Sequence, residues 1–459
     1  MIQQQTKLCL GTMKMVPWPA LLRGVSKALR PSFMNGQVSI LPYSCTSTLA
    51  QIQTPPANET EKNNDSLKVQ TSAADTTAPA EHLKEVAVIM KVKEVASALE
   101  LCANFNSHQR FEALRNFVAI KTRPLPLIQS ITEGLITSAD ELDMKQLSDL
   151  LFLMGKLNYM NEDILSKTCE AIKTKLDKTK TAAVVGSSIA SLRYFKWKDP
   201  ELLDQFSIWI ERNFEKFSNP SSFILTLALQ NHSPPNLEEL LKLTWSEWIE
   251  MRRCSPVDTV NFVWAVQALN SQFENEKMRQ IINLFLENRF LRTLDSRPQS
   301  LPVWRKLCNL HAVAKSTSGL TDTFAIPDDI KTLMSAKSQH KDQLVSEVLQ
   351  LLFSDLDSNL YTRDVPSGMG FPIDILFCLD DKMKATQLHL SAGSKIAVMI
   401  HSYHECCQPT KEPSGVRSFE MRLLQEEFKV ISVPYHILGG GYAQVHEYFD
   451  SVLNKLVKS

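Results

Sequence analysis

Residue types that ligate metals or act as nucleophiles gather in the run "KIAVMIHSYHECC", which extends from Lys395 to Cys407. An apolar stretch there is followed at once by polar and reactive side chains: His401, His404, Glu405, Cys406 and Cys407. Zinc sites usually draw their ligands from two separated pairs, and two adjacent cysteines do not easily approach one tetrahedral ion. The pattern therefore favours the end of a buried strand with polar neighbours, and a zinc site is the alternative.

The segments on either side of this run alternate between predicted strands and predicted helices. Short apolar runs bounded by Gly, Pro and Ser predict three β-strands, and helical periodicity predicts two helices. The strands are expected at 370–380, 395–400 and 429–436, and the helices at 419–428 and 443–458. The sequence therefore predicts a small α/β domain over residues 365–459.

Residues 81–294 show helical periodicity almost throughout, with prolines between the expected helices. An apolar helix, a short polar turn and a second amphipathic helix recur in this region. The matching turn positions are Leu157, Phe195, Gln230 and Leu269, so the steps are 38, 35 and 39 residues. This spacing predicts stacked helical hairpins that bury their apolar faces against one another, and a non-repeating helical domain is the alternative.

Residues 295–364 separate the repeats from the predicted strands and contain helical segments at 301–316 and 337–355. Four tryptophans at helical spacing are expected to pack in the core: Trp245, Trp248, Trp264 and Trp304. The predicted fold is therefore mostly α, with a helical-repeat body followed by a small C-terminal α/β domain.

The chain has no acidic residue before Glu59, but this stretch contains five basic residues. A helix at 21–30 would place leucines on one face and basic residues on the other. Such a segment is typical of a mitochondrial transit peptide, here assigned to residues 1–49, and the polar residues 50–80 are expected to form a disordered linker. The predicted location is the mitochondrial matrix. A disordered N-terminus that lacks acids by chance is the alternative.

The complete chain balances 50 basic against 50 acidic residues. Without the leader, 45 basic residues would face 50 acidic ones, a net charge near −5 that argues against a uniformly basic nucleic-acid binder. Any contact with RNA would then need a local basic patch. The nine cysteines form no paired framework, which indicates a reducing compartment. No run approaches the ~18 apolar residues of a membrane span.

Strand "KIAVMI", helix "FEMRLLQEEF", strand "KVISVPYH" and the closing helix together resemble the RAP domain. The runs "VDTVNFVWAVQALNSQ" (257–272) and "PVWRKLCNLHAVAK" (302–315) resemble segments of the FAST-kinase-domain family, whose first and second segments correspond to residues 220–292 and 295–364. That family joins a mitochondrial leader, helical repeats, two family-specific segments and a C-terminal RAP domain. The same order is found here over about residues 200–459.

This resemblance implies a mitochondrial RNA-binding protein that acts on transcript stability, processing or ribosomal RNA maturation. Mitochondrial RNA is the implied partner, together with proteins of RNA granules or of ribosome assembly, and no cofactor is implied. Kinase activity gains no support, because the chain has no Gly-rich phosphate loop and no HRD or DFG motif.

RAP domains resemble reduced PD-(D/E)xK nucleases, which need carboxylates to hold a divalent metal and a lysine beside them. The resemblance gives Asp374 the first acidic position, but Met399 stands where the next strand should supply the second acid. His401 is a poor ligand for a hard cation. No catalytic residue is therefore assigned, and Asp374 is a weak metal candidate. A metal-dependent endoribonuclease that uses Asp374 together with Glu405 or Glu420 is the alternative.

RNA contacts need Lys or Arg for phosphates and flat side chains for unpaired bases. Such residues are interleaved around the predicted strand ends: Lys411, Arg417, Arg422, Lys429, Tyr403, Tyr435, His436 and His401. A second basic group lies around the FAST-like segments: Arg252, Arg253, Arg289, Arg292, Arg305 and Lys306. An ordinary solvated surface is the alternative for each residue, and a protein-interaction scaffold without RNA contact is the third hypothesis for the chain.

Overall fold

The computed structural model describes residues 95–246, 255–291, 300–318, 326–335, 339–352, 357–380, 385–386 and 393–458. The described residues divide into two units, 95–172 and 173–458, and each is described by itself. The predicted leader and linker at residues 1–80 lie outside the described residues.

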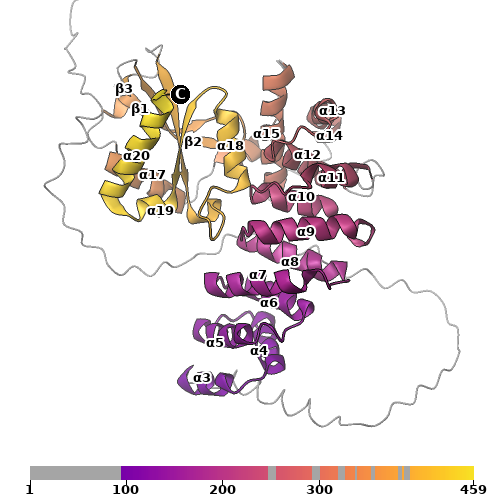
Figure 1. The fold of residues 1–459 in the computed structure, drawn as a ribbon. Helices are drawn as coiled ribbons and strands as arrows, with labels where there is room; N and C mark the ends of the chain where they lie inside the picture. Colours follow the sequence, from indigo (N-terminus) through magenta and orange to yellow (C-terminus); the bar gives the residue numbers. More distant parts are fainter. Residues whose placement is uncertain are drawn as a thin grey trace, which may run out of the picture. The chain divides into compact units, whose positions relative to one another are not determined.

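Helices make up the first unit and the larger part of the second, and their labels are those of Figure 1. The unit 95–172 contains α3 (Val95–Ala103), α4 (Ser107–Ala119), α5 (Leu125–Thr137), α6 (Met144–Lys156) and the first part of α7 (Glu162–Leu176). The second unit continues with α8 (Ala182–Phe195), α9 (Pro200–Arg212), α10 (Pro220–Leu229), α11 (Leu237–Thr244), α12 (Pro256–Ala268), α13 (Asn275–Leu286), α14 (Asn288–Leu291), α15 (Leu301–Ser318), α16 (Asp328–Ser335) and α17 (Gln339–Leu352). The mostly helical fold that the sequence predicts is therefore confirmed.

The first helix of each hairpin ends in the same backbone motif. A residue with positive φ follows α4, α6, α8, α10 and α12 in turn, at Lys121, Asn158, Lys196, Asn231 and Asn270. The N–H of the next residue donates back across the last turn in every case, as from Tyr159 to the carbonyl of Met154 at 2.9 Å. This is the Schellman motif. The positions are 37, 38, 35 and 39 residues apart, and the last four directly follow the predicted turn positions, so the repeat is confirmed.

Prolines begin several of these helices rather than interrupt them. Pro200, Pro220 and Pro256 occupy the first turns of α9, α10 and α12, where a missing N–H costs no helical hydrogen bond. The residue before each proline caps the helix with its side chain, as Asp199 does by accepting from the Leu202 N–H at 3.0 Å. The cap and the proline together fix where each helix starts.

The first helices of successive hairpins pack side by side in the second unit. Helix α10 contacts α8 and α12, and α12 contacts α15. Helix α12 is buried on nearly all sides, with Trp264 completely inaccessible to solvent. Trp245 and Trp304 are also buried, which confirms three of the four predicted core tryptophans, and Trp248 lies outside the described residues.

The C-terminal part of the second unit contains one mixed sheet in the order β1-β2-β4-β5, with β3 paired to β2. Its strands are β1 (Tyr361–Pro366), β2 (Pro372–Leu379), β3 (Ala385–Thr386), β4 (Ser394–His401) and β5 (Lys429–Pro434). Strand β4 is antiparallel to β2 and parallel to β5, and α18 (Gly415–Leu424) makes the crossover. Two helices follow β5: α19 (Tyr435–Leu438) and α20 (Gly441–Lys458).

Helices cover both faces of this sheet (Figure 1). One apolar core joins α17 and α20 to one face, where Val348 and Phe449 pack with residues such as Val398. A smaller core joins α18 to the other face, where Leu424 packs with Met399. The three predicted strands and the small α/β domain are confirmed. Strand β1 was not predicted, because "YTRDVP" is half exposed and has no apolar run.

Helix α18 also attaches the sheet to the repeats of the same unit. Phe419 packs edge-on against Trp264, with ring centroids 5.8 Å apart. Gly415 lies so close to α10 that a Cβ atom there would be 1.6 Å from the carbonyl oxygen of Ala228. Any side chain at this position would separate the two helices, so glycine is required by the close approach.

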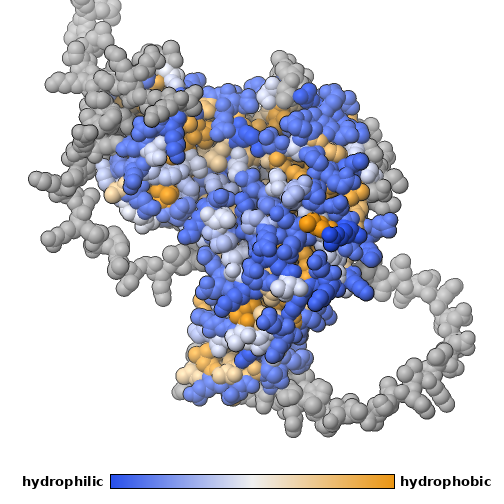
Figure 2. Space-filling view, viewed as in Figure 1, coloured by the Kyte–Doolittle hydropathy of each residue, from blue (hydrophilic) through white to orange (hydrophobic). Residues whose placement is uncertain are grey.

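Figure 2 shows one face of the molecule, which is largely hydrophilic with smaller hydrophobic areas between the polar ones. Single exposed apolar side chains of this kind are ordinary on a folded protein. Within the described ranges, no helix has the length and apolar composition that crossing a membrane requires.

Candidate functional site

The run that contains both cysteines forms the end of β4 and the turn after it. His401 is the last residue of β4, and Tyr403–Glu405 forms the short 3-10 helix η5. Burial raises the pKa of Cys406 and of Cys407 to about 11, so both thiols are protonated at neutral pH and are weak metal ligands. In the described part of the chain, no three His, Cys, Asp or Glu side chains are grouped to hold a metal ion.

Charged side chains from four elements meet behind this turn, and we call them the ionic cluster. Its members are Lys341 of α17, Asp374 of β2, Glu405 of η5, and Arg417 and Glu420 of α18. The Lys341 ammonium lies 3.1 Å from Asp374 Oδ2 and 3.1 Å from Glu405 Oε2. Lys341 is thus the cation that two acids from distant parts of the chain share.

The remaining bonds of the ionic cluster satisfy its other members. Asp374 Oδ2 also accepts from the backbone N–H of Ile400 at 2.7 Å. Arg417 donates to Glu405 Oε1, and its other terminal nitrogen lies 2.5 Å from Glu420 Oε2. Three acids and two bases therefore form one connected network, which a buried group of charges needs in order to be stable.

The positions of these side chains show whether the acids suggested by the nuclease resemblance could hold a divalent metal. The pairing of Ile375 with Val398, extended by one residue, places Asp374 opposite Met399, as the resemblance implied. A thioether is a poor ligand for magnesium. The second carboxylate comes instead from Glu405, and the Lys341 ammonium lies between the two acids. The residues therefore suit an internal ion pair and do not fit a metal site.

His401 lies beside the ionic cluster and is completely buried. Burial, with the charges of Arg417 and Lys341, lowers the pKa of His401 well below 6.5, so the imidazole is neutral at physiological pH. Neither ring nitrogen has a hydrogen-bond partner among the described residues. His401 is thus an internal group, and its side chain does not reach a surface where RNA would pass.

Three of the basic residues predicted to contact phosphates form hydrogen bonds with other groups of this chain. Arg417 belongs to the ionic cluster. Arg422 donates to the carbonyl of Ala268 at 3.2 Å, which places its charge at the C-terminal end of α12. Lys429 donates to the carbonyl of Leu456 at 2.8 Å. Four other predicted basic residues cannot be placed, because Arg252, Arg253, Arg292 and the side chain of Arg289 lie outside the described part of the structure.

Four aromatic side chains form a continuous group, which we call the aromatic patch: Tyr403, His404, Tyr435 and His436. The rings of Tyr403 and Tyr435 are 5.3 Å apart and nearly perpendicular. His404 lies 5.5 Å from Tyr403, and His436 lies 5.7 Å from Tyr435. His404 is exposed and the other three are half-buried. The fold thus brings together η5 and α19, which are about 30 residues apart in the sequence.

Two lysines lie beside the aromatic patch, and we call them the basic rim: Lys196 and Lys411. Lys411 is exposed, and its charge adds to burial in lowering the pKa of His436. Lys196 donates from its ammonium to the backbone carbonyl of His404. No pattern in the sequence indicated Lys196, since this residue directly follows α8 and lies 208 residues before His404.

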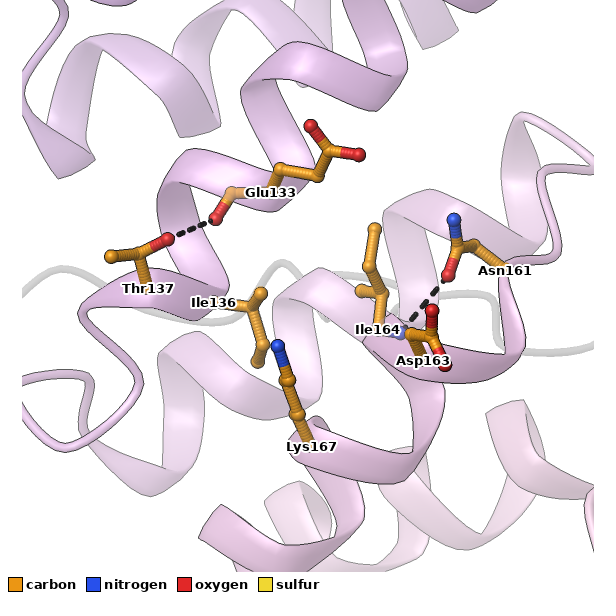
Figure 3. Close-up of a pocket in the computed structure, with 7 residues that line it drawn as sticks. All are labelled: Glu133, Ile136, Thr137, Asn161, Asp163, Ile164 and Lys167. Carbon is orange, nitrogen blue, oxygen red and sulfur yellow. Dashed lines mark hydrogen bonds between the residues drawn. The ribbon is translucent and has the colours of Figure 1, made fainter.

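The unit 95–172 contains a shallow pocket, shown in Figure 3. Its lining residues are Glu133, Ile136, Thr137, Asn161, Asp163, Ile164 and Lys167. The hydrogen bonds drawn there are local to their helices: the Thr137 hydroxyl donates to the Glu133 carbonyl, and Asn161 accepts from the Ile164 N–H. These bonds stabilise helix ends, and we assign no chemistry to the pocket.

Comparison with known proteins finds a distant relative. No family model matches the chain. A region of 219 residues, 47% of this chain, is 22% identical to the FAST kinase domain-containing protein 4 of Rattus norvegicus. The match covers 34% of that relative, so the chain spans about a third of its length. For about half of its length, the chain is thus similar to a protein of the FAST kinase-like group, which suggests that family.

Proposed function

We propose that this chain is a mitochondrial RNA-binding regulator that acts on transcript stability, processing or ribosomal RNA maturation. The observation that carries the proposal is the aromatic patch with its basic rim, which combines flat rings and cations at one place on the surface. The similarity to a FAST kinase domain-containing protein supports the same function. The partners we propose are mitochondrial RNA and proteins of RNA granules or of ribosome assembly.

The aromatic patch has the chemistry that single-stranded RNA requires. Unpaired bases stack on aromatic rings, and each such contact contributes about 1–3 kcal/mol. Lys411, which is exposed, would hold a phosphate of the same nucleotides, and Lys196 holds the backbone of His404 in place by donating to its carbonyl. Because this interface is local, it does not need a basic surface over the whole chain. The net charge near −5 that is expected for the chain without residues 1–49 is therefore compatible with RNA binding.

The first test removes the rings. Changing Tyr403 and Tyr435 together to Ala should weaken binding of a single-stranded oligonucleotide by roughly tenfold or more, as expected from the loss of one to two stacked bases. Tyr442→Ala is the matched control, because Tyr442 is an exposed tyrosine of α20 outside the aromatic patch. Equal affinities of the double variant and the wild type, measured by fluorescence anisotropy, would reject this interface.

The second test removes a charge of the basic rim. Lys411→Gln should lower the salt dependence of RNA binding by roughly 0.7 in the logarithmic slope, the value for one phosphate contact of a single strand. The preferred base sequence should not change, because phosphate contacts carry no sequence information. Lys455→Gln, at an exposed lysine of α20, should leave the slope unaltered. A slope that is the same in all three proteins would remove Lys411 from the interface.

The cellular part of the proposal needs intact mitochondria. Crosslinking followed by sequencing of the bound RNA should enrich mitochondrial transcripts with the wild-type chain and not with the double tyrosine variant. Recovery of proteins without any enriched transcript would favour the interaction-scaffold hypothesis. Residues 1–49, fused to a reporter protein, should direct it into mitochondria, and a reporter that stays in the cytosol would contradict the proposed matrix location.

The nuclease alternative has less support, because an ammonium and a thioether take the places beside Asp374. Asp374→Ala should therefore leave unaltered any RNA cleavage that a preparation of the protein contains. Magnesium-dependent cleavage that disappears with this one change, in a variant whose circular dichroism spectrum matches that of the wild type, would establish the alternative.

A further inference from the structure

In the described part of the helical repeats, two partly buried cationic side chains have no acidic partner. Arg193, in the last turn of α8, donates to the Ser222 hydroxyl of α10 at 2.9 Å. Lys306 of α15 donates to the Asn261 side-chain carbonyl of α12 at 2.5 Å. We call these four residues the cation row, since they extend across four helices of the second unit.

The partners of the cation row are neutral. Within the described residues, neither Arg193 nor Lys306 forms an ion pair with Asp or Glu, and each makes a hydrogen bond to an uncharged side chain. The Lys306 ammonium also lies 5.3 Å from the ring centre of Trp264, a cation–π contact. Two desolvated positive charges are therefore held near each other, and no acidic side chain among the described residues pairs with either of them.

The energetics of the cation row favour binding of an anion. Burial lowers the pKa of Arg193, and burial together with the nearby Arg193 charge lowers the pKa of Lys306 to about 8. Partly buried charges of like sign destabilise a fold unless a counterion compensates them. Groups that a protein keeps in such a state are frequently part of a binding site.

We propose that the cation row binds a phosphate group. The guanidinium of Arg193 offers a planar pair of donors, which suits two oxygens of one phosphate, and the Lys306 ammonium supplies a second charge. The hydroxyl of Ser222 can donate a further hydrogen bond. The phosphate can belong to RNA or be free. The assignment to RNA rests on the proposed function, whereas phosphate binding itself does not.

The first experiment measures phosphate binding without RNA. Inorganic phosphate should raise the melting temperature of the full chain, and this response should disappear when Arg193→Met and Lys306→Met are combined. Lys315→Met, at an exposed lysine of the same helix α15, should respond as the wild type does. A double variant with the wild-type phosphate response would overturn the proposal.

The double variant also separates a binding site from a structural role. Without phosphate, its melting temperature should equal or exceed that of the wild type, because two repelling charges have been removed. If the cation row were only structural, the same changes would lower the melting temperature and leave the phosphate response intact in the folded protein. That pair of results would contradict the proposal.

Chemical labelling of lysines tests the proposed phosphate site in the wild-type chain. At pH 8, Lys306 is about half neutral and should react with an amine acylating reagent faster than Lys315, as read by mass spectrometry. Bound phosphate should raise the pKa of Lys306 and slow its labelling by at least about twofold, which is the effect of a pKa that rises by roughly half a unit. Labelling of Lys306 that phosphate does not slow would overturn the proposal.

The final experiment identifies the source of the phosphate. If it belongs to RNA, the double methionine variant should bind a single-stranded oligonucleotide roughly tenfold more weakly, with a salt slope lower by about 1.4 for two contacts. Loss of the phosphate response with unchanged RNA affinity would keep the site and assign it to a free phosphate compound. A chain that binds phosphate but no RNA would reject the proposed function and leave the phosphate site standing.

Discussion

In the helical repeats, buried hydroxyl groups donate to carbonyls one turn earlier in their own helix, whereas the α/β part joins buried charges from distant segments. Thr132 donates to Ile128 at 2.8 Å and Thr168 donates to Ile164 at 2.6 Å. In the ionic cluster, by contrast, Lys341 and Glu405 are 64 residues apart. These hydroxyl groups of the repeats are thus satisfied locally, whereas the charges of the ionic cluster are satisfied through tertiary structure.

This difference has consequences for stability. A hydroxyl bonded within its own helix keeps its partner whenever that helix forms. A member of the ionic cluster keeps its partners only when several elements are in place, and its removal leaves the others buried and unpaired. We therefore expect single changes to have larger effects in the ionic cluster than at polar positions of the repeats.

The largest expected effect is that of Lys341→Met. Because Asp374 and Glu405 would lose the cation they share, the free energy of unfolding should fall by about 3–5 kcal/mol, as when one partner of a buried pair is removed. Urea unfolding of the α/β part, followed by hydrogen exchange, measures the change. Lys331→Met removes the exposed partner of Asp328 and should change stability little. Equal changes in the free energy of unfolding for the two substitutions would contradict the expected difference between the ionic cluster and exposed polar positions.

A smaller effect concerns pH. The unfolded chain binds a proton at His401 below pH 6.5, and the folded chain does not, because its folded pKa is well below that value. Stability therefore falls as pH decreases, by up to about 1.4 kcal/mol for each pH unit below 6.5. His401→Leu should make this dependence shallower, measured by urea unfolding at pH 7 and pH 5.5. Met399→Leu, a buried change without a titrating group, should keep the wild-type slope.

The smallest expected effect tests the local character of the repeats. Lys121 holds the left-handed conformation after α4, with φ of 55°, where glycine has no steric cost. Lys121→Gly should therefore stabilise the unit 95–172 by about 0.5–1 kcal/mol. The same substitution at Lys167, an exposed position inside α7, should destabilise by about 1 kcal/mol. Thermal unfolding that shows the same sign for both would contradict the assignment of the turn motif.

The sequence was informative wherever a pattern repeats or an apolar run is long. The turn positions near Leu157 and Leu269 could be predicted because one backbone motif recurs with similar spacing. Strand β1 was missed because its side chains are half exposed on a sheet edge. Helix α18 begins at Gly415, before its predicted start, because its first turn packs against the repeats rather than following an amphipathic pattern.

The candidate site was only partly predictable. Tyr403, Tyr435 and Lys411 were chosen from residue type, and the structure brings the two rings together with Lys411 near His436. Arg417 was chosen for the same reason, but it is paired with Glu405 and Glu420 inside the α/β part. Residue type alone does not reveal whether a basic side chain points outward or completes an internal network.

The helical repeats, their turns and the alternation of strand and helix near the C-terminus could be inferred from the amino-acid sequence alone. These features depend on interactions between residues a few positions apart, which leave a period in the sequence. The position of Lys341 between Asp374 and Glu405, and that of Lys196 beside the aromatic patch, became apparent only from the three-dimensional structure. Such contacts join residues that are far apart in the chain, and their partners are chosen by the packing of whole elements rather than by local spacing.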